Sequence, residues 1–162
     1  MIRQVSIEDA DKIAEIYNYF IESTIATFEE QLIDVEEMKK RILGVIQKFP
    51  WIVYENNGQI MGYAYAGIWK NRSAYKHSVE ITVYLNQKIT SNGIGSKLYY
   101  ELIKQLKELG VHVVIGGISL PNEISVALHE KFGFKKVAHF KEVGYKFNKW
   151  VDVGYWQLTI SK

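Results

Sequence analysis

The chain has 162 residues, of which 48% are hydrophobic and 23% charged, so it can form a hydrophobic core and general disorder is excluded. Twenty basic and 18 acidic residues give a formal net charge of +2, which excludes a strong overall electrostatic attraction to nucleic acid or membrane surfaces. The absence of cysteine excludes disulfides and thiolate metal sites, and no apolar run has the length of a signal peptide core or a membrane span. We therefore expect one soluble, cytoplasmic domain over residues 1–162.

Two amphipathic helices are predicted in the first fifty residues. Ser6 and Asp9 have the spacing of a capping box, and apolar residues then recur at helical spacing through Phe20. The segment 21–32 has no clear period, so we expect a loop there. Asp34 is the expected N-cap of the second helix.

Three strands are predicted next. Residues 51–54 and 60–67 flank a turn with Asn57-Gly58, a pair that tolerates the positive φ values of a tight hairpin. A polar and aromatic loop then leads to a strand at 78–85. Its side chains alternate, with Glu80 on the polar face and aliphatic residues on the other.

The second half of the chain alternates helices and strands. A leucine stripe that includes Leu109 predicts the buried face of a helix, which Gly110 closes. The remaining elements are predicted as a buried central strand at 112–118, a short helix at 123–132, and two strands at 135–145 and 152–160. This order predicts a mixed α/β fold.

The turn Gly93-Ile94-Gly95 stands between a predicted strand and the leucine-rich helix. Glycine lets a ligand approach the backbone closely, and the free N–H groups of a helix start attract anions. This arrangement indicates phosphate binding, but such glycine pairs also serve as ordinary tight turns. Two nucleotide signatures are absent, because Leu98 replaces the third glycine of the dinucleotide fingerprint and no P-loop lysine follows.

Longer stretches carry a more specific pattern over nearly the whole chain. They are Phe49–Val53, Tyr63–Ala66, Asn71–Tyr75, Val79–Leu85, Asn92–Tyr99, Leu120–Asn122, Leu128–Phe134 and Trp150–Gln157. In this order they resemble the GNAT acetyltransferase superfamily, and most closely its phosphinothricin acetyltransferase branch. The resemblance implies a central mixed, mostly antiparallel twisted sheet flanked by helices, and an acetyl-CoA-dependent N-acetyltransferase.

The resemblance also implies where acetyl-CoA binds. The cofactor would lie between the strands at 78–85 and 112–118, with its pantetheine arm bonded to the backbone of Val83, Tyr84 and Leu85. The main-chain amides that would hold the pyrophosphate are those of Ser91, Asn92, Gly93, Ile94, Gly95 and Ser96. Asn122 and Lys131 would contact the cofactor from the following loop and helix.

One position departs from the family pattern. Superfamily members usually carry Gln or Arg three residues before the first glycine of this turn, and here the residue is Thr90. Backbone amides are unaffected by such a change, so phosphate binding is still expected, with a lower cofactor affinity.

Acetyl transfer to an amine needs a base, a donor to the oxyanion and a proton for the departing thiolate. Glu80 is the candidate base, because half-burial beside the cofactor raises a carboxyl pKa and the branch uses the glutamate at this position. A glutamate paired with a lysine or arginine is the alternative. His129 stands where many GNAT enzymes carry a tyrosine, and it is the candidate acid or proton relay. The alternative is a histidine that only packs on its helix. A backbone N–H near Val83 would be the oxyanion donor.

For the substrate, the branch acetylates phosphinothricin and related amino acids such as methionine sulfone or sulfoximine. These molecules carry a carboxylate beside the amine. Arg72 is the expected carboxylate clamp, and Tyr75 and Phe28 are the expected pocket walls. The alternatives are a solvated loop charge for Arg72 and a core anchor for Phe28.

The remaining expectations concern partners. No His-x-x-x-His pair or acidic cluster supports a metal, so we expect none. The resemblance favours a homodimer, and we expect neither nucleic acid nor membrane as a partner. Two other functions stay open: acetylation of a peptide or protein amine, and a non-catalytic acyl-CoA-binding module, which only Thr90 supports.

Overall fold

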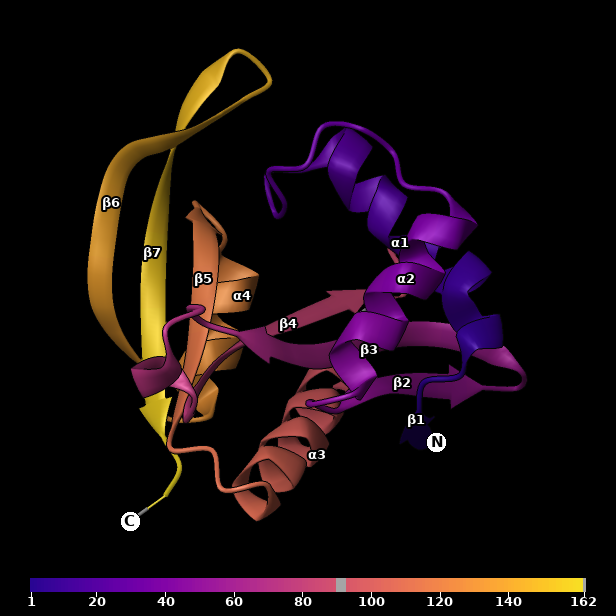
Figure 1. The fold of residues 1–162 in the computed structure, drawn as a ribbon. Helices are drawn as coiled ribbons and strands as arrows, with labels where there is room; N and C mark the ends of the chain where they lie inside the picture. Colours follow the sequence, from indigo (N-terminus) through magenta and orange to yellow (C-terminus); the bar gives the residue numbers. More distant parts are fainter. Residues whose placement is uncertain (90–92, 162) are drawn as a thin grey trace.

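The computed structural model describes residues 1–89 and 93–161 and contains a seven-stranded sheet with helices packed against it (Figure 1). The helices are α1 (Ala10–Ser23), α2 (Val35–Ile46), α3 (Ile94–Glu108) and α4 (Glu123–Lys131), with single 3-10 turns at Ile7–Asp9 and Ser73–Tyr75. The strands are β1 (Ile2–Gln4), β2 (Trp51–Asn56), β3 (Gln59–Ile68), β4 (Ser78–Leu85), β5 (Val113–Leu120), β6 (Lys135–Lys146) and β7 (Lys149–Thr159). None of the described helices is both long and apolar enough to cross a membrane.

The sheet has the order β1-β2-β3-β4-β5-β7-β6. Strands β4 and β5 run parallel, and the other five neighbouring pairs are antiparallel. The predicted mixed, mostly antiparallel sheet with flanking helices is therefore confirmed. In Figure 1 strands β5–β7 run upright while β2–β4 run across the view, so the two parts of the sheet diverge.

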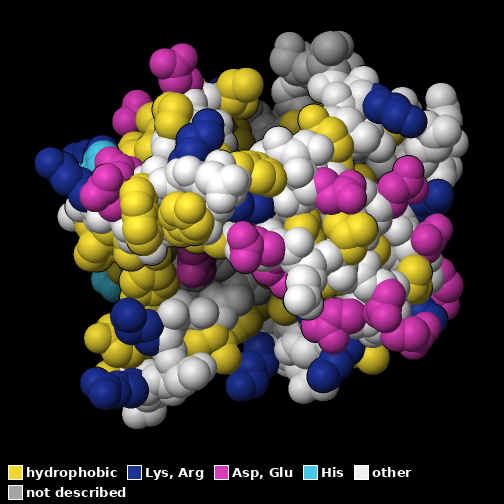
Figure 2. Space-filling model, turned by 90° about the horizontal axis from the view of Figure 1, so that it is seen from above, with side chains coloured by type: hydrophobic (Ala, Val, Ile, Leu, Met, Phe, Trp, Pro, Cys, Tyr) yellow, Lys and Arg dark blue, Asp and Glu magenta, His cyan; other side chains and the backbone are white. Residues whose placement is uncertain are grey.

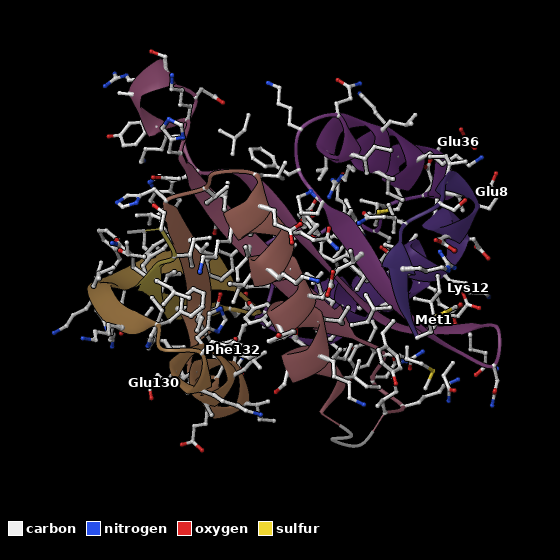
Figure 3. The ribbon with its side chains drawn as sticks, turned by 90° about the horizontal axis from the view of Figure 1, so that it is seen from below. Met1, Glu8, Lys12, Glu36, Glu130 and Phe132 are labelled. Carbon is white, nitrogen blue, oxygen red and sulfur yellow. The ribbon has the colours of Figure 1, made fainter. Side chains whose placement is uncertain are left out.

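The two parts lie on opposite sides of the molecule. Seen from below in Figure 3, Glu130 and Phe132 at the end of α4 lie on the side of β5–β7. Met1 and Glu8 lie on the other side, near the N-terminal helices. Any site between β4 and β5 is consequently built from both sides.

Each face of the sheet has its own hydrophobic cluster. Leu98, Leu102 and Leu106 of α3 belong to one cluster, and Ile13 of α1 and Ile42 of α2 belong to the other. Successive strand residues point to opposite faces, so β2 and β3 contribute to both clusters. Full burial of an aliphatic side chain of this size contributes about 1.5–3 kcal/mol, which fixes the helices on the sheet.

Several local signals in the sequence are confirmed. Asp34 caps α2, where its carboxylate accepts a hydrogen bond of 2.8 Å from the Glu37 N–H. Asn57 and Gly58 have φ values of +50° and +75° in the β2–β3 turn, and Gly110 has φ +76° after α3. These positions are where glycine and asparagine are tolerated and other residues are strained.

Other predictions are wrong at the edges of elements. Helix α1 continues to Ser23, so the loop predicted from residue 21 begins later. Leu109, predicted on the buried face of its helix, is 59% exposed because it is the C-cap residue of α3. Strand β1 was missed because three residues are too short to show a period. The connection between β6 and β7 is shorter than predicted, because only Phe147 and Asn148 separate the two strands in the chain.

Candidate active site

The sheet opens between β4 and β5. These strands pair from Ser78 opposite Val113 to Glu80 opposite Ile115, whereas β4 stays paired with β3 as far as Leu85. A cavity of about 420 Å³ lies in the opening. A strand that leaves its neighbour keeps N–H and C=O groups without ladder partners, so the edge of β4 after Glu80 can bond an extended ligand.

The cavity is lined from both faces of the sheet. One group of lining residues comes from α1 and the loop that follows it, and another comes from α3, α4 and β5. Together with Glu80–Leu85 the lining residues are Phe20, Ala26, Thr27, Gly95, Tyr99, Gly117, Ile118, Ser119, Asn122, Ile124, Ser125, Leu128 and His129. The predicted residues Glu80, Val83, Tyr84, Leu85, Gly95, Asn122 and His129 are therefore brought together in one place.

Glu80 lies where β4 and β5 part. A Cβ atom placed on Gly117 would lie 3.1 Å from Glu80 Oε1 and 3.0 Å from Tyr155 Cε1, so the carboxylate and the phenol ring both lie over that glycine. Burial raises the pKa of the Glu80 carboxyl, and no cationic side chain among the described residues contributes to that pKa. The alternative of a glutamate held by a lysine or arginine has no support in this geometry. A half-buried carboxylate with a raised pKa is suited to accept a proton.

His129 is 3% exposed and both of its ring nitrogens have partners. Nδ1 lies 2.7 Å from the Ser125 carbonyl oxygen, which can only accept, so Nδ1 carries the ring proton. In the neutral ring, Nε2 then accepts a hydrogen bond of 2.9 Å from the Tyr99 hydroxyl. Burial lowers the pKa of His129, which favours this neutral form, and burial raises the pKa of Tyr99. The two residues form a buried pair beside the cavity.

The start of α3 provides main-chain donors. Gly93 is the N-cap residue with φ +68°, a conformation that favours glycine, and the N–H groups of the first turn have no partners within the helix. Lys131 Nζ donates to Ser96 Oγ at 3.0 Å, which places a cation from α4 beside this turn. Of the other residues predicted to bind phosphate, Ser91 and Asn92 lie outside the described residues, as does Thr90.

The start of α4 faces the cavity through Asn122. Its side-chain Oδ1 caps the helix by accepting a hydrogen bond of 3.1 Å from the Ser125 N–H. The capping bond uses the oxygen and leaves the amide N–H₂ donors for another partner.

Among the described residues, the structure brings no group of three or more His, Cys, Asp and Glu side chains into a metal-binding arrangement.

The three predicted substrate residues lie outside the described lining of the cavity. Phe28 packs over Gly144, since a Cβ atom on that glycine would lie 2.3 Å from the ring. Arg72 and Tyr75 are exposed on the β3–β4 connection. Sequence reasoning in turn missed Ala26 and Thr27, because they belong to a segment without any periodic signal.

Tyr99 and Tyr155 were not among the predicted site residues. In the structure, Tyr99 contacts His129 and Tyr155 lies beside Glu80. These contacts with His129 and Glu80, which only the fold shows, bring both tyrosines to the site.

Known proteins resemble this chain over nearly its whole length. The model of the acetyltransferase (GNAT) domain family matches residues 2–154. Phosphinothricin N-acetyltransferase of Streptomyces viridochromogenes is 36% identical over 96% of this chain and 85% of its own, and L-amino acid N-acyltransferase MnaT of Escherichia coli is 34% identical over 99% and 94%. An acetyltransferase structure from Salmonella typhimurium, solved with its cofactor acetyl-CoA, has a TM-score of 0.97 at 31% identity and covers 100% of this chain and 94% of its own.

Proposed function

Because this chain belongs to the GNAT family and is an N-acetyltransferase, we propose that it acetylates the amino group of a small amino acid, of the phosphinothricin or methionine sulfone type. The names of the two relatives support an amino-acid acceptor. The observation that carries the proposal is the half-buried carboxylate of Glu80 at the point where β4 and β5 separate.

The residues present fit acetyl-CoA, which supplies the acetyl thioester. The free edge of β4 at Val83, Tyr84 and Leu85 offers main-chain partners to the amides of a pantetheine arm. The first turn of α3, with Gly93, Ile94, Gly95 and Ser96, offers donors to a pyrophosphate. Lys131 adds a positive charge there, and the side-chain N–H₂ of Asn122 is free to donate.

The chemistry in this proposal begins at Glu80. Its carboxylate takes a proton from the substrate ammonium, so that the neutral amine can attack the thioester carbonyl. A main-chain N–H near Val83 donates to the oxygen on which negative charge develops. Its position on the free edge of β4, within the same cavity as Glu80, supports this role.

His129 enters the proposal on the thiolate side, together with Tyr99. Because Nε2 of the neutral ring is an acceptor, His129 is not a free acid and instead holds the Tyr99 hydroxyl. In the proposed relay this hydroxyl gives its proton to the departing thiolate and regains one from solvent after the thiol leaves. Both side chains line the cavity, which supports this role.

The acceptor amino acid would lie on the Glu80 side of the cavity. Tyr155, whose ring lies beside Glu80, contacts Trp69 with ring centroids 5.4 Å apart, and Trp69 begins the β3–β4 connection. A substrate that extends along these rings would enter the β3–β4 connection. There Arg72 would bind its carboxylate and Tyr75 would form a wall of the pocket. On the opposite side, Phe28 follows the lining residue Thr27 and would wall the pocket.

We also propose that the protein is a homodimer. Large apolar side chains are exposed along β6, the turn that follows it and the start of β7, and Figure 2 shows apolar side chains gathered on this side of the molecule. They are Val137, Phe140, Val143, Tyr145, Phe147 and Trp150. Exposed apolar groups gathered in this way are typical of an interaction surface. A molecular mass of one chain by light scattering would exclude the dimer.

The test of the proposed function is a panel of acceptors incubated with acetyl-CoA and a thiol reagent. The panel contains L-phosphinothricin, L-methionine sulfone, ordinary amino acids and short peptides. We expect thiol release with one or more of the free amino acids. Release only with peptides would replace the proposal with a peptide acetyltransferase, and cofactor binding without release from any acceptor would indicate a non-catalytic module.

A further inference from the structure

Lys146, near the tip of the β6–β7 hairpin, is a buried charge outside the motifs described above. The residue is 2% exposed. Its ammonium donates hydrogen bonds of 2.8 Å to the carbonyl oxygens of Thr24 and Thr27, and it lies 5.0 Å from the centre of the Phe147 ring. An ammonium in a buried position is unfavourable unless it is hydrogen-bonded, so these two bonds hold it to the loop that follows α1.

The same loop is held from its other side by α1 and α2. The Tyr17 hydroxyl and Thr27 Oγ1 form a hydrogen bond of 2.8 Å. The Arg41 guanidinium donates to the two carboxylate oxygens of Glu29 at 2.6 and 2.8 Å, which is the fork geometry of a strong ion pair. Residues 24–30, called the acceptor loop below, are therefore fixed between the N-terminal helices and the hairpin.

A second contact joins the acceptor loop to the hairpin. The Phe28 ring lies on Gly144, where a Cβ atom would meet it at 2.3 Å, so the ring needs the bare backbone of a glycine there. In Figure 1 the loop after α1 and the hairpin belong to the two diverging parts of the molecule. The Lys146 contacts join residues separated by 122 and 119 positions in the sequence. They bridge the two parts next to the cavity.

The consequence for the site follows from Ala26 and Thr27, which line the cavity together with Glu80. We propose that Lys146 is a positioning residue, which ties the acceptor loop to the β6–β7 hairpin and so holds the wall against which the amine substrate binds. This role rests on the proposed function, because it assigns the Glu80 side of the cavity to the amine. It does not involve the start of α3, where acetyl-CoA binds.

The test compares Lys146→Met with Lys149→Met, a matched control at the exposed lysine that pairs with Lys146 across the hairpin turn. Methionine keeps the length of the side chain but cannot donate to the Thr24 and Thr27 carbonyls. We expect the KM for the amino acid to rise about tenfold, while kcat and the KM for acetyl-CoA change less than twofold. Lys146→Arg, which keeps the charge and the donors, should restore part of the affinity. The control should match the wild type.

A measurement that does not depend on enzyme activity separates this proposal from the proposed function. Hydrogen exchange should show faster exchange of the amides of residues 24–30 in Lys146→Met and unchanged exchange in α3. If Lys146→Met does not fold, Gly144→Ala is the second variant, because its new Cβ atom would displace the Phe28 ring of the acceptor loop. It should give the same rise in the amine KM and the same faster exchange of residues 24–30. An unchanged amine KM together with unchanged exchange of residues 24–30 would overturn the proposal. A wild type that acetylates no amine would overturn the proposed function but would leave the exchange result to be judged by itself.

Discussion

The side of the cavity that we propose for acetyl-CoA, called the cofactor side, and the side that we propose for the amine, called the acceptor side, are built in different ways. The cofactor side comes from short continuous segments: the end of β4, the glycine turn before α3, and the start of α4 at Asn122. The acceptor side contains Ala26 and Thr27 of the loop after α1. Outside the described lining, Lys146 of the β6–β7 hairpin holds this loop, and the ring of Tyr155 lies beside Glu80 and against Trp69. Local motifs can specify the binding of a cofactor, whereas the proposed acceptor wall depends on tertiary contacts. The two sides meet at Glu80.

The largest expected effect is at this junction. Glu80→Gln keeps the size of the side chain but cannot accept the proton, so kcat/KM for the amine should fall about a hundredfold, as is typical for loss of a general base. Calorimetry should find an acetyl-CoA affinity within twofold of the wild type, because the carboxylate is assigned to the acceptor side. An equal loss in both measurements would remove the distinction between the two sides.

The pH dependence of the same variant sharpens this test. Burial raises the pKa of Glu80 from its ordinary value, and the base must be ionised to act. In the wild type, kcat/KM should therefore decline as the pH falls through that raised pKa. Glu80→Gln should lack this acidic limb. Retention of the limb by the variant would assign the titration to another group.

A smaller effect is expected when Glu80 is displaced and not removed. In Gly117→Ala the new Cβ would lie 3.1 Å from Glu80 Oε1 and 3.0 Å from Tyr155, so the carboxylate must shift by a few tenths of an ångström. We expect kcat to fall about tenfold, since errors of about 1 Å in position cost about a hundredfold. Gly67→Ala is the control, because Gly67 pairs with Glu80 from β3 but has open space for a Cβ atom. Equal activity of the two variants would argue against precise placement of the carboxylate.

The sequence predicted those parts of the fold that have local causes. Asp34 caps a helix through its own side chain, Asn57 and Gly58 adopt positive φ, and the alternation of 78–85 sets the face on which Glu80 lies. The family resemblance then located the β4 edge and the start of α3. Residue roles taken from it are still predictions for this chain.

The acceptor side was less predictable for a physical reason. The segment of Ala26 and Thr27 has no period of its own, since its conformation is set by Tyr17, Arg41 and Lys146 from other elements. A lysine near the end of the chain reads as a solvated charge in a sequence, and only the fold places it among the carbonyl oxygens of residues 24 and 27. Arg72 and Tyr75 were chosen for their chemistry, and the structure leaves both exposed.

The central claim is that the gap between β4 and β5 receives acetyl-CoA so that its thioester lies beside Glu80. A crystal structure of the protein with acetyl-CoA tests this most directly. The account predicts the pantetheine arm along Val83–Leu85, the pyrophosphate at the first turn of α3 and the thioester next to the Glu80 carboxylate. A cofactor bound outside this gap, or with its thioester remote from Glu80, would contradict it.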